Sequence, residues 1–202
     1  VDYIEIGTDE DYKLYMEMLR RVADNDLSVD ENYAAACEMI DLQSWIDYYA
    51  IELYICNTDW PTNNRSMWRV RKPGDQPDGD GKWRWVLYDV NLSMDIPRAD
   101  NDFINRTSKR DPIFASLLEN KSFRKALEAR MVELAENYMS PERVDAFVDD
   151  YVSRMRHAMG NEYMRFMNTR TEEDFVESCE AIKTFFRLRH DYIVEEYGDK
   201  EK

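Results

Sequence analysis

Two short polar clusters contain the side chains best suited to chemistry. The first is "NTDWPTNN" at residues 57–64, with Asp59 and Asn64, and the second is "YDVN" at residues 88–91, with Asp89 and Asn91. Carboxylate and amide oxygens are hard ligands that suit Mg²⁺, and water or phosphate oxygens commonly complete its shell. If the clusters meet in space, they predict a magnesium site that can also receive a phosphate-bearing ligand.

A β-hairpin between the two clusters is the element expected to bring them together. The segments "MWRVR" (67–71) and "KWRWVLY" (82–88) alternate in polarity, and the stretch "KPGDQPDGDG" separates them. Alternating segments joined by Gly, Pro and Asp predict two antiparallel strands with a long tip. Because the tip lies at the far end, we expect Asn64, before the first strand, to lie close to Asp89, after the second.

The spacing of these residues matches the order of parts in a protein-kinase active site. Asp59 and Asn64 are separated by 64 − 59 = 5, the interval of the catalytic-loop pattern D-x-x-x-x-N. In that pattern the Asp accepts the proton of the attacking hydroxyl, the Asn holds metal, and a second Asp follows a hairpin. Asp89 follows Asp59 by 89 − 59 = 30 residues, with the long tip as the extra length. A plain turn is the alternative, because Asn, Asp and Pro also gather in turns.

Helices are expected to make up most of the remaining chain. Apolar residues at helical spacing, caps and breakers predict helices over 9–26, from the capping box "SVDE" (28–31) to 39, over 41–56, from Asp111-Pro112 to 120, and over 122–139, 140–160 and 171–196. The helix at 41–56 is apolar around much of its girth and should be central. Residues 92–110 show no periodicity and predict a long loop. The expected fold class is mainly α with one β-hairpin.

Composition narrows the classes of function. The chain has 202 residues, 44% of them hydrophobic, and its 42 acidic and 27 basic residues give a formal charge of −15. This charge argues against nucleic acids and anionic membranes as partners, and no apolar run is long enough to span a bilayer. The three cysteines form no C-x-x-C pair and are expected to be structural. Arg187 and Arg189 are expected to pair with the acidic surface.

Four segments resemble the spore-coat protein H (CotH) kinase family over residues 28–195. They are "IDLQSWIDYYAIELYI" with the "NTDWPTNN" that follows it, "KWRWVLYDVN", "DPIFASLLENKSFRKALEARM" and "FFRLRHDYI". Members of that family are atypical, secreted or spore-associated protein kinases with a divergent kinase-like fold. The resemblance implies that Asp59 is the catalytic-loop Asp, that Asn64 binds metal and cofactor, and that Asp89 is the first acid of a D-x-D motif. Asn91 stands where the second acid usually lies.

The same resemblance implies the lobe of a kinase that holds the catalytic loop. We find no Gly-rich loop, no β3-type Lys and no run of N-terminal strands. Residues 1–202 are therefore expected to form a single C-terminal lobe that needs an N-terminal lobe to use ATP with Mg²⁺ or Mn²⁺. The expected reaction is phosphoryl transfer to Ser or Thr of an unidentified protein, in an extracytoplasmic or cell-surface setting in bacteria. The alternatives are a non-catalytic pseudokinase, which the Asn at 91 favours, and a protein-binding helical module of a surface or spore-coat protein.

Overall fold

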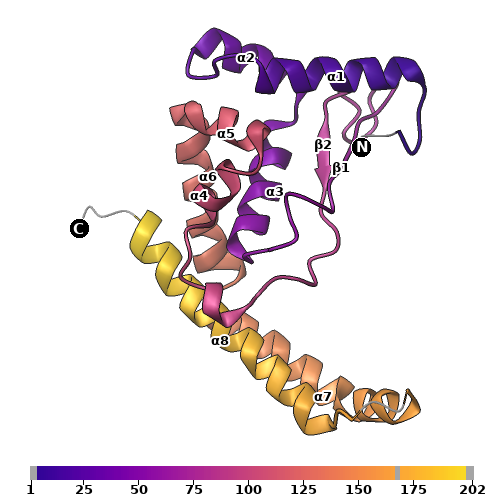
Figure 1. Cartoon of the computed structure of the whole chain (residues 1–202), viewed down its shortest axis with the longest axis vertical. Coiled ribbons are helices and arrows are strands. Elements are labelled where there is room, and N and C mark those ends of the chain that lie inside the picture. The colour runs from indigo at the N-terminus through magenta and orange to yellow at the C-terminus, as the bar shows by residue number, and fades with distance from the viewer. Residues whose placement is uncertain (1–3, 167–168, 199–202) are drawn as a thin grey trace.

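The computed structural model describes residues 4–166 and 169–198, and within them it is mainly helical with a two-stranded antiparallel sheet (Figure 1). In chain order the elements are α1 (Asp9–Ala23), α2 (Asp30–Met39), α3 (Leu42–Tyr54), β1 (Ser66–Trp68), β2 (Arg84–Val86), the 3-10 turn η1 (Ile96–Arg98), α4 (Phe103–Ser108), α5 (Pro112–Glu119), α6 (Lys121–Glu133), the π-helical turn η2 (Leu134–Tyr138), α7 (Pro141–Arg165) and α8 (Glu172–Tyr197). The expected mainly α fold with one hairpin is confirmed.

Helix α3 lies at the centre of the fold, as its wide apolar surface predicts. Asp41 begins the helix by accepting a hydrogen bond from the backbone N–H of Ser44 at 3.1 Å. Most side chains from Trp45 to Tyr54 are buried, and α4, α6 and β2 pack against them. In Figure 1 the helices α4, α5 and α6 lie on one side of α3 and the hairpin lies on the other. Full burial of each large apolar side chain contributes about 1.5–3 kcal/mol.

The hairpin gains its stability from the junction between α2 and α3. Its register pairs Ser66 with Val86, Met67 with Trp85 and Trp68 with Arg84. A two-stranded hairpin alone is marginal in water. Here the backbone N–H of Trp83 donates to the carbonyl of Met39 at 2.9 Å, and the N–H of Asp41 donates to the carbonyl of Trp83 at 3.0 Å. The indole N–H of Trp45 donates to that same carbonyl at 2.9 Å. Three hydrogen bonds therefore tie Trp83, the residue before β2, to the helical core.

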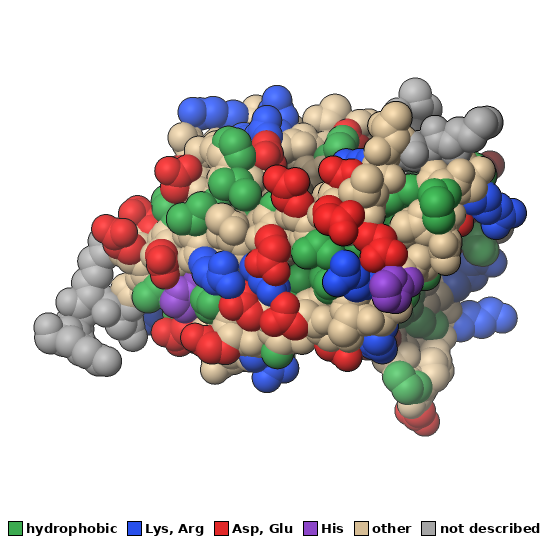
Figure 2. Space-filling model, turned by 90° about the horizontal axis from the view of Figure 1, so that it is seen from below, with side chains coloured by type: hydrophobic (Ala, Val, Ile, Leu, Met, Phe, Trp, Pro, Cys, Tyr) green, Lys and Arg blue, Asp and Glu red, His purple; other side chains and the backbone are tan. Residues whose placement is uncertain are grey.

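Helices α7 and α8 form a long antiparallel pair that extends away from the other helices (Figure 1). The pair has a small core of its own around Val148, Phe175 and Cys179. Thr171 and Asp174 form the capping box that the "TEED" segment predicts at the start of α8. Figure 2 views the molecule from this end and shows acidic and basic side chains interspersed on the surface. None of the helices in the described ranges has the length and apolar character needed to cross a membrane.

Arg189 lies in the core, so the expectation that it pairs with the acidic surface was wrong. Its side chain is 1% exposed, and its guanidinium donates to four backbone carbonyls at 2.8–3.0 Å, those of Leu53, Tyr54, Ala99 and Asn101. Two of these carbonyls belong to the last turn of α3, where helix carbonyls have no intrahelical partner and carry a partial negative charge. Arg187 does pair with a surface acid, Asp145, at 2.6 Å.

Residues 92–110 are not a loop throughout, because η1 and α4 lie within them. Asp102 begins α4 by accepting a hydrogen bond from the backbone N–H of Asn105 at 2.9 Å. Phe103, Ile104 and Thr107 are then buried against the core. The helix was missed because six residues are too few to show a helical period, and tertiary burial stabilises it instead.

Several predicted helix ends also differ from the structure. The expected capping box at 28–31 does not form, because the Ser28 hydroxyl donates to the carboxylate of Asp26 at 2.5 Å and α2 begins after Val29. Helix α1 ends earlier than predicted, at Ala23, and α7 continues past Gly160 to Arg165. Such shifts reflect competing local hydrogen bonds and packing that residue patterns do not encode.

Candidate functional site

The loop of residues 57–64 begins at a tightly closed end of α3. Cys56 has a left-handed backbone with φ 55°, at the position where helices usually place glycine. The backbone N–H of Cys56 donates to the carbonyl of Leu53 at 3.3 Å, and that of Asn57 donates to the carbonyl of Glu52 at 3.2 Å. This pair of bonds is the Schellman motif. It reverses the chain and brings Asn57 next to Glu52.

A buried side-chain contact continues this motif into the loop. The amide nitrogen of Asn57 donates to Oε2 of Glu52 at 2.9 Å, and both residues are 0% exposed. The amide oxygen of Asn57 in turn accepts a hydrogen bond from the backbone N–H of Asp59 at 3.2 Å. The start of the loop is therefore held by side chains as well as by the backbone.

Asp59 and Asn64 are in direct contact. Nδ2 of Asn64 donates to Oδ2 of Asp59 at 2.8 Å, and Nδ2 of Asn63 donates to Oδ1 of Asp59 at 2.6 Å. Asn64 reaches this position with a left-handed backbone, φ 57°, which Asn tolerates better than most residues. Because the Asn64 amide group directs its nitrogen at Asp59, its carbonyl oxygen points elsewhere and can serve as a ligand atom.

Backbone contacts on both sides hold the two polar clusters next to each other. The backbone N–H and the hydroxyl of Thr58 both donate to the carbonyl of Leu92, at 3.0 and 2.9 Å, and Ser66 pairs with Val86. These contacts bring the ends of the segments 59–65 and 87–91 together, at Thr58 with Leu92 and at Ser66 with Val86.

Asp89 and Asn91 lie on the exposed part of the second segment. Asp89 has a left-handed backbone with φ 51°. Within the described ranges neither side chain forms a hydrogen bond or ion pair. Both are thus open to a ligand, and their roles stay predictions.

The donor set is rich in oxygen but poor in carboxylates. Within residues 4–166 and 169–198, no three His, Cys, Asp or Glu side chains lie together as a metal site. The expected ligands are the Asp89 carboxylate and the amide oxygens of Asn64 and Asn91. Mg²⁺ commonly binds through one or two carboxylates, keeps several waters and takes further oxygens from substrate phosphates. With a single carboxylate among them, these expected ligands would need water and phosphate oxygens to complete the shell of a Mg²⁺ ion.

A layer of buried aromatic side chains packs beneath the loop of residues 57–64, on its core side. Trp60 is fully buried, and its ring meets those of Tyr48 and Tyr49 edge to face, with centroids 5.9 and 5.7 Å apart. The Tyr49 hydroxyl donates to the carboxylate of Asp111 at 3.1 Å, and burial raises the pKa of this tyrosine. Arg65 approaches the same carboxylate at 3.6 Å. The loop is thus anchored to the core at Trp60 and, just past Asn64, at Arg65.

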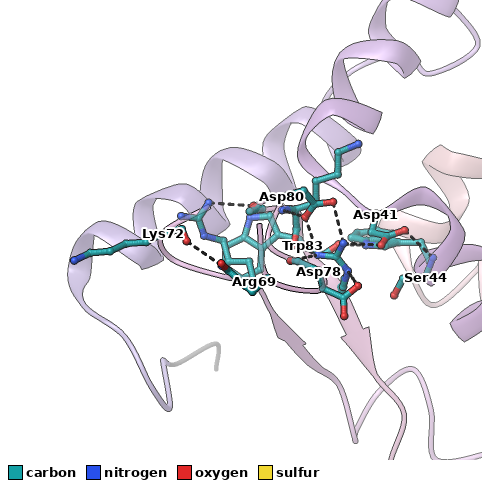
Figure 3. Close-up of polar contacts among 12 residues, drawn as sticks. Asp41, Ser44, Arg69, Lys72, Asp78, Asp80 and Trp83 are labelled. Atoms are coloured by element: carbon teal, nitrogen blue, oxygen red, sulfur yellow. Dashed lines mark hydrogen bonds and ion pairs between the residues drawn. The ribbon is translucent and has the colours of Figure 1, made fainter. Parts of the chain in front are cut away.

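The far end of the hairpin is held by a cluster of charges around Arg84. Its guanidinium contacts Asp41 at 2.8 Å and Asp80 at 2.9 Å, and Asp78 lies 3.7 Å away; Figure 3 shows these three acids converging. The hydrogen bonds from Arg84 lower the pKa of Asp80 to about 2. This pairing explains how a charged side chain such as Arg84 can be buried. Leu87, the residue after the end of β2, is 42% exposed.

An open groove of about 430 Å³ runs between α3 and the hairpin. Its lining includes Asp41, Asp47, Ile51, Arg84 and Leu87, and none of the four predicted site residues contributes to it. The groove and the predicted site are therefore separate features of the described surface.

Glu52 and Asn57 are site residues that the sequence patterns did not single out. Glu52 was visible as the lone charged residue in the apolar run "YYAIELYIC", and an acid inside such a run is seldom fully buried without a reason. Asn57 gave no separate signal, because an Asn after a helix is typical of an ordinary turn.

The chain is a mainly helical domain in which an Asp and an Asn five residues apart precede a hairpin and a second Asp. The chain matches the family described as "CotH kinase protein" over residues 2–193. It therefore belongs to the CotH kinase family, as the resemblance indicated, and the match also takes in α1, which lies before residue 28. No curated protein and no solved structure matches the chain.

Proposed function

We propose that this protein is the catalytic lobe of an atypical protein kinase, which transfers the γ-phosphoryl group of ATP to a Ser or Thr hydroxyl of another protein. The observation that carries the proposal is the 2.8 Å contact between Asp59 and Asn64 at the entrance to the hairpin that leads to Asp89. Membership of the CotH kinase family supports the same reaction class.

Asp59 is assigned to the acceptor hydroxyl. Its carboxylate orients the hydroxyl and takes its proton while the hydroxyl oxygen bonds to the γ-phosphorus. The bond from that phosphorus to the bridging oxygen breaks, and ADP leaves. The amides of Asn63 and Asn64 fix the carboxylate by donating to both of its oxygens. General-base catalysis of this kind contributes about 10²–10⁴-fold.

Asn64, Asp89 and Asn91 are assigned to the cation and the phosphates. Mg²⁺ or Mn²⁺ bound there neutralises charge on the transferred group. The exposed position of Asp89 and Asn91 leaves their oxygens free for this role. The overall charge of −15 suits a nucleotide that enters with its cation rather than as a free anion.

The test is incorporation of labelled phosphate from [γ-³²P]ATP by the full-length protein with Mg²⁺ or Mn²⁺, scored on itself and on added proteins. Asp59→Asn and Asp89→Asn should each lower incorporation by about 100-fold or more. Asp95→Asn is the matched control, since Asp95 is an exposed carboxylate paired with Arg98, and it should label normally. Undiminished labelling by Asp89→Asn would refute the proposal.

A non-catalytic, partner-binding role is the second candidate, and the observation in its favour is Asn91 in place of a second acid. An amide oxygen compensates the charge of a cation less than a carboxylate does. This candidate predicts no phosphate incorporation and no heat of binding when the full-length protein is titrated with Mg-ATP in a calorimeter. Phosphate incorporation that Asp59→Asn abolishes would exclude it.

A further inference from the structure

Glu52 is a buried acid that the fold does not neutralise. Its side chain is 0% exposed on α3, and no cation within the described ranges forms an ion pair with it. Oε2 accepts a hydrogen bond from Asn57, while Oε1 has no partner. Burying an unpaired carboxylate is strongly unfavourable, and such a group shifts its pKa in response. A stable fold gains nothing from this arrangement unless the carboxyl group serves another purpose.

The end of α3 does not require the carboxyl group. The two backbone bonds of the Schellman motif already satisfy the carbonyls of Glu52 and Leu53, and Arg189 donates to that of Tyr54. What Glu52 adds is an acceptor for the Asn57 amide nitrogen. That bond fixes the orientation of the amide, so its oxygen faces the backbone N–H of Asp59.

A continuous chain of contacts therefore leads from Glu52 to the predicted catalytic carboxylate. It runs from Oε2 of Glu52 to the side chain of Asn57 at 2.9 Å and from there to the backbone of Asp59 at 3.2 Å. The side chain of Asp59 then contacts Asn64 at 2.8 Å. Each link is a hydrogen bond between groups that are buried or half-buried, where such bonds are strongest.

We propose that Glu52 is a positioning residue that acts through Asn57 to hold Asp59 in its working orientation. The inference rests on the proposed function for its catalytic consequence, but its structural part, control of the Asp59 backbone by Glu52, can be tested without any activity.

The ionisation of Glu52 gives this link a dependence on pH. Burial raises the pKa of the Glu52 carboxyl to about 7, although the hydrogen bond from Asn57 favours the ionised form. Tyr48, one turn earlier on α3, is the titratable side chain whose charge couples to Glu52, and burial raises its pKa too, so it stays neutral. Near neutral pH both forms of Glu52 are populated, and the ionised form accepts more strongly from Asn57.

Two variants separate the acceptor role of Glu52 from its bulk. Glu52→Gln keeps an oxygen that can accept from Asn57, whereas Glu52→Leu removes it. In the full-length protein, Glu52→Leu should lower kcat for phosphate transfer by about 10-fold or more and leave KM for ATP within about 2-fold. Glu52→Gln should retain most of kcat. Ile51→Ala, the neighbouring position on α3, controls for loss of helix packing and should not lower kcat.

The second readout is hydrogen exchange at the backbone amide of Asp59, followed by NMR. This amide should exchange about 10-fold faster in Glu52→Leu and in Asn57→Ala, and the double variant should be no faster than either alone. Glu52→Gln should exchange at the wild-type rate. Asn57→Ala removes the same contact and leaves Glu52 in place, so the result does not depend on Glu52→Leu folding well.

The outcomes distinguish the two proposals. If the wild-type protein transfers no phosphate, the proposed function fails, and the exchange rates of Asp59 still decide whether Glu52 controls the loop. If Asp59 exchanges equally in wild type, Glu52→Leu and Asn57→Ala, the positioning role is wrong even where transfer is observed. Additive effects of Glu52→Leu and Asn57→Ala on exchange would also overturn it, because residues acting through one contact cannot be additive.

Discussion

Replacing Glu52 by Gln should change how the stability of this protein depends on pH. The folded protein holds the Glu52 proton more tightly than the unfolded chain, because burial raises the pKa from 4.5 to about 7. The stability that this proton contributes is complete below about pH 4.5 and is lost as the pH rises through about 7. Gln has no such proton, so the variant should lack this loss.

The size of the effect follows from the two pKa values. The difference between a pKa of 4.5 and one of about 7 corresponds to about 3 kcal/mol, since each pKa unit is worth about 1.4 kcal/mol. Between about pH 5.5 and pH 8.5, which avoids the sequence pI of 4.6, linkage predicts that wild type loses about 2 kcal/mol more than Glu52→Gln. A constant offset from the new amide group, about 1–3 kcal/mol if its N–H groups lack acceptors, cancels in this difference.

The assay is urea unfolding followed by tryptophan fluorescence, at matched ionic strength and at about pH 5.5, 7 and 8.5. Other titrating groups, such as Asp80, are common to both proteins and cancel. Glu119→Gln, at an exposed position on α5, should track wild type within about 0.5 kcal/mol. Parallel curves for wild type and Glu52→Gln would show that Glu52 ionises in the folded state as it does in the unfolded chain, which would refute the reasoning.

Three further variants test other contacts. Arg189→Met removes hydrogen bonds to four backbone carbonyls, of which that of Leu53 still accepts from the N–H of Cys56. It should lower the free energy of unfolding by about 3–5 kcal/mol in urea titration, whereas Arg187→Met, at an exposed ion pair, should cost under about 1 kcal/mol; equal losses would contradict the structure. Asp111→Ala removes the cap of α5 and the acceptor of the Tyr49 hydroxyl and should cost about 2–3 kcal/mol by the same measurement, and a loss below about 0.5 kcal/mol would argue against both contacts. Arg84→Met removes the ion pairs to Asp41, Asp78 and Asp80 that hold the hairpin tip, and should speed limited proteolysis between residues 69 and 82. An unchanged cleavage rate would show that these ion pairs do not hold the tip.

Much of the architecture could be predicted because it depends on neighbours in sequence. The central helix α3 follows from apolar spacing, and the starts of α5 and α8 follow from Asp111-Pro112 and from Thr171 with Asp174. The hairpin followed from two alternating segments and a turn-rich tip. Asp59 and Asn64, which were assigned to the predicted site from their five-residue interval, are in direct contact.

The errors fall where distant contacts compete with local rules. The helix α4 inside the expected loop exists because its apolar side chains are buried by other elements. The missing capping box at residues 28–31 reflects an alternative acceptor, Asp26, for the Ser28 hydroxyl. Strands β1 and β2 are shorter than their alternation suggests, because residues 39–41 take over the pairing at Trp83.

The sequence by itself determined the identity and order of the reactive groups: an Asp and an Asn five residues apart, a hairpin, and a second Asp, on a mainly helical chain. Local hydrogen bonding and side-chain periodicity depend on residues that are close together in the chain, so these features can be predicted from the sequence. The tertiary structure alone decided the surroundings of those groups, in which the Glu52 carboxyl is buried beneath Asn57 and Arg189 spans carbonyls from two distant segments. The burial of a charge and the partners that it finds depend on which remote surfaces pack together, and no local pattern contains that information.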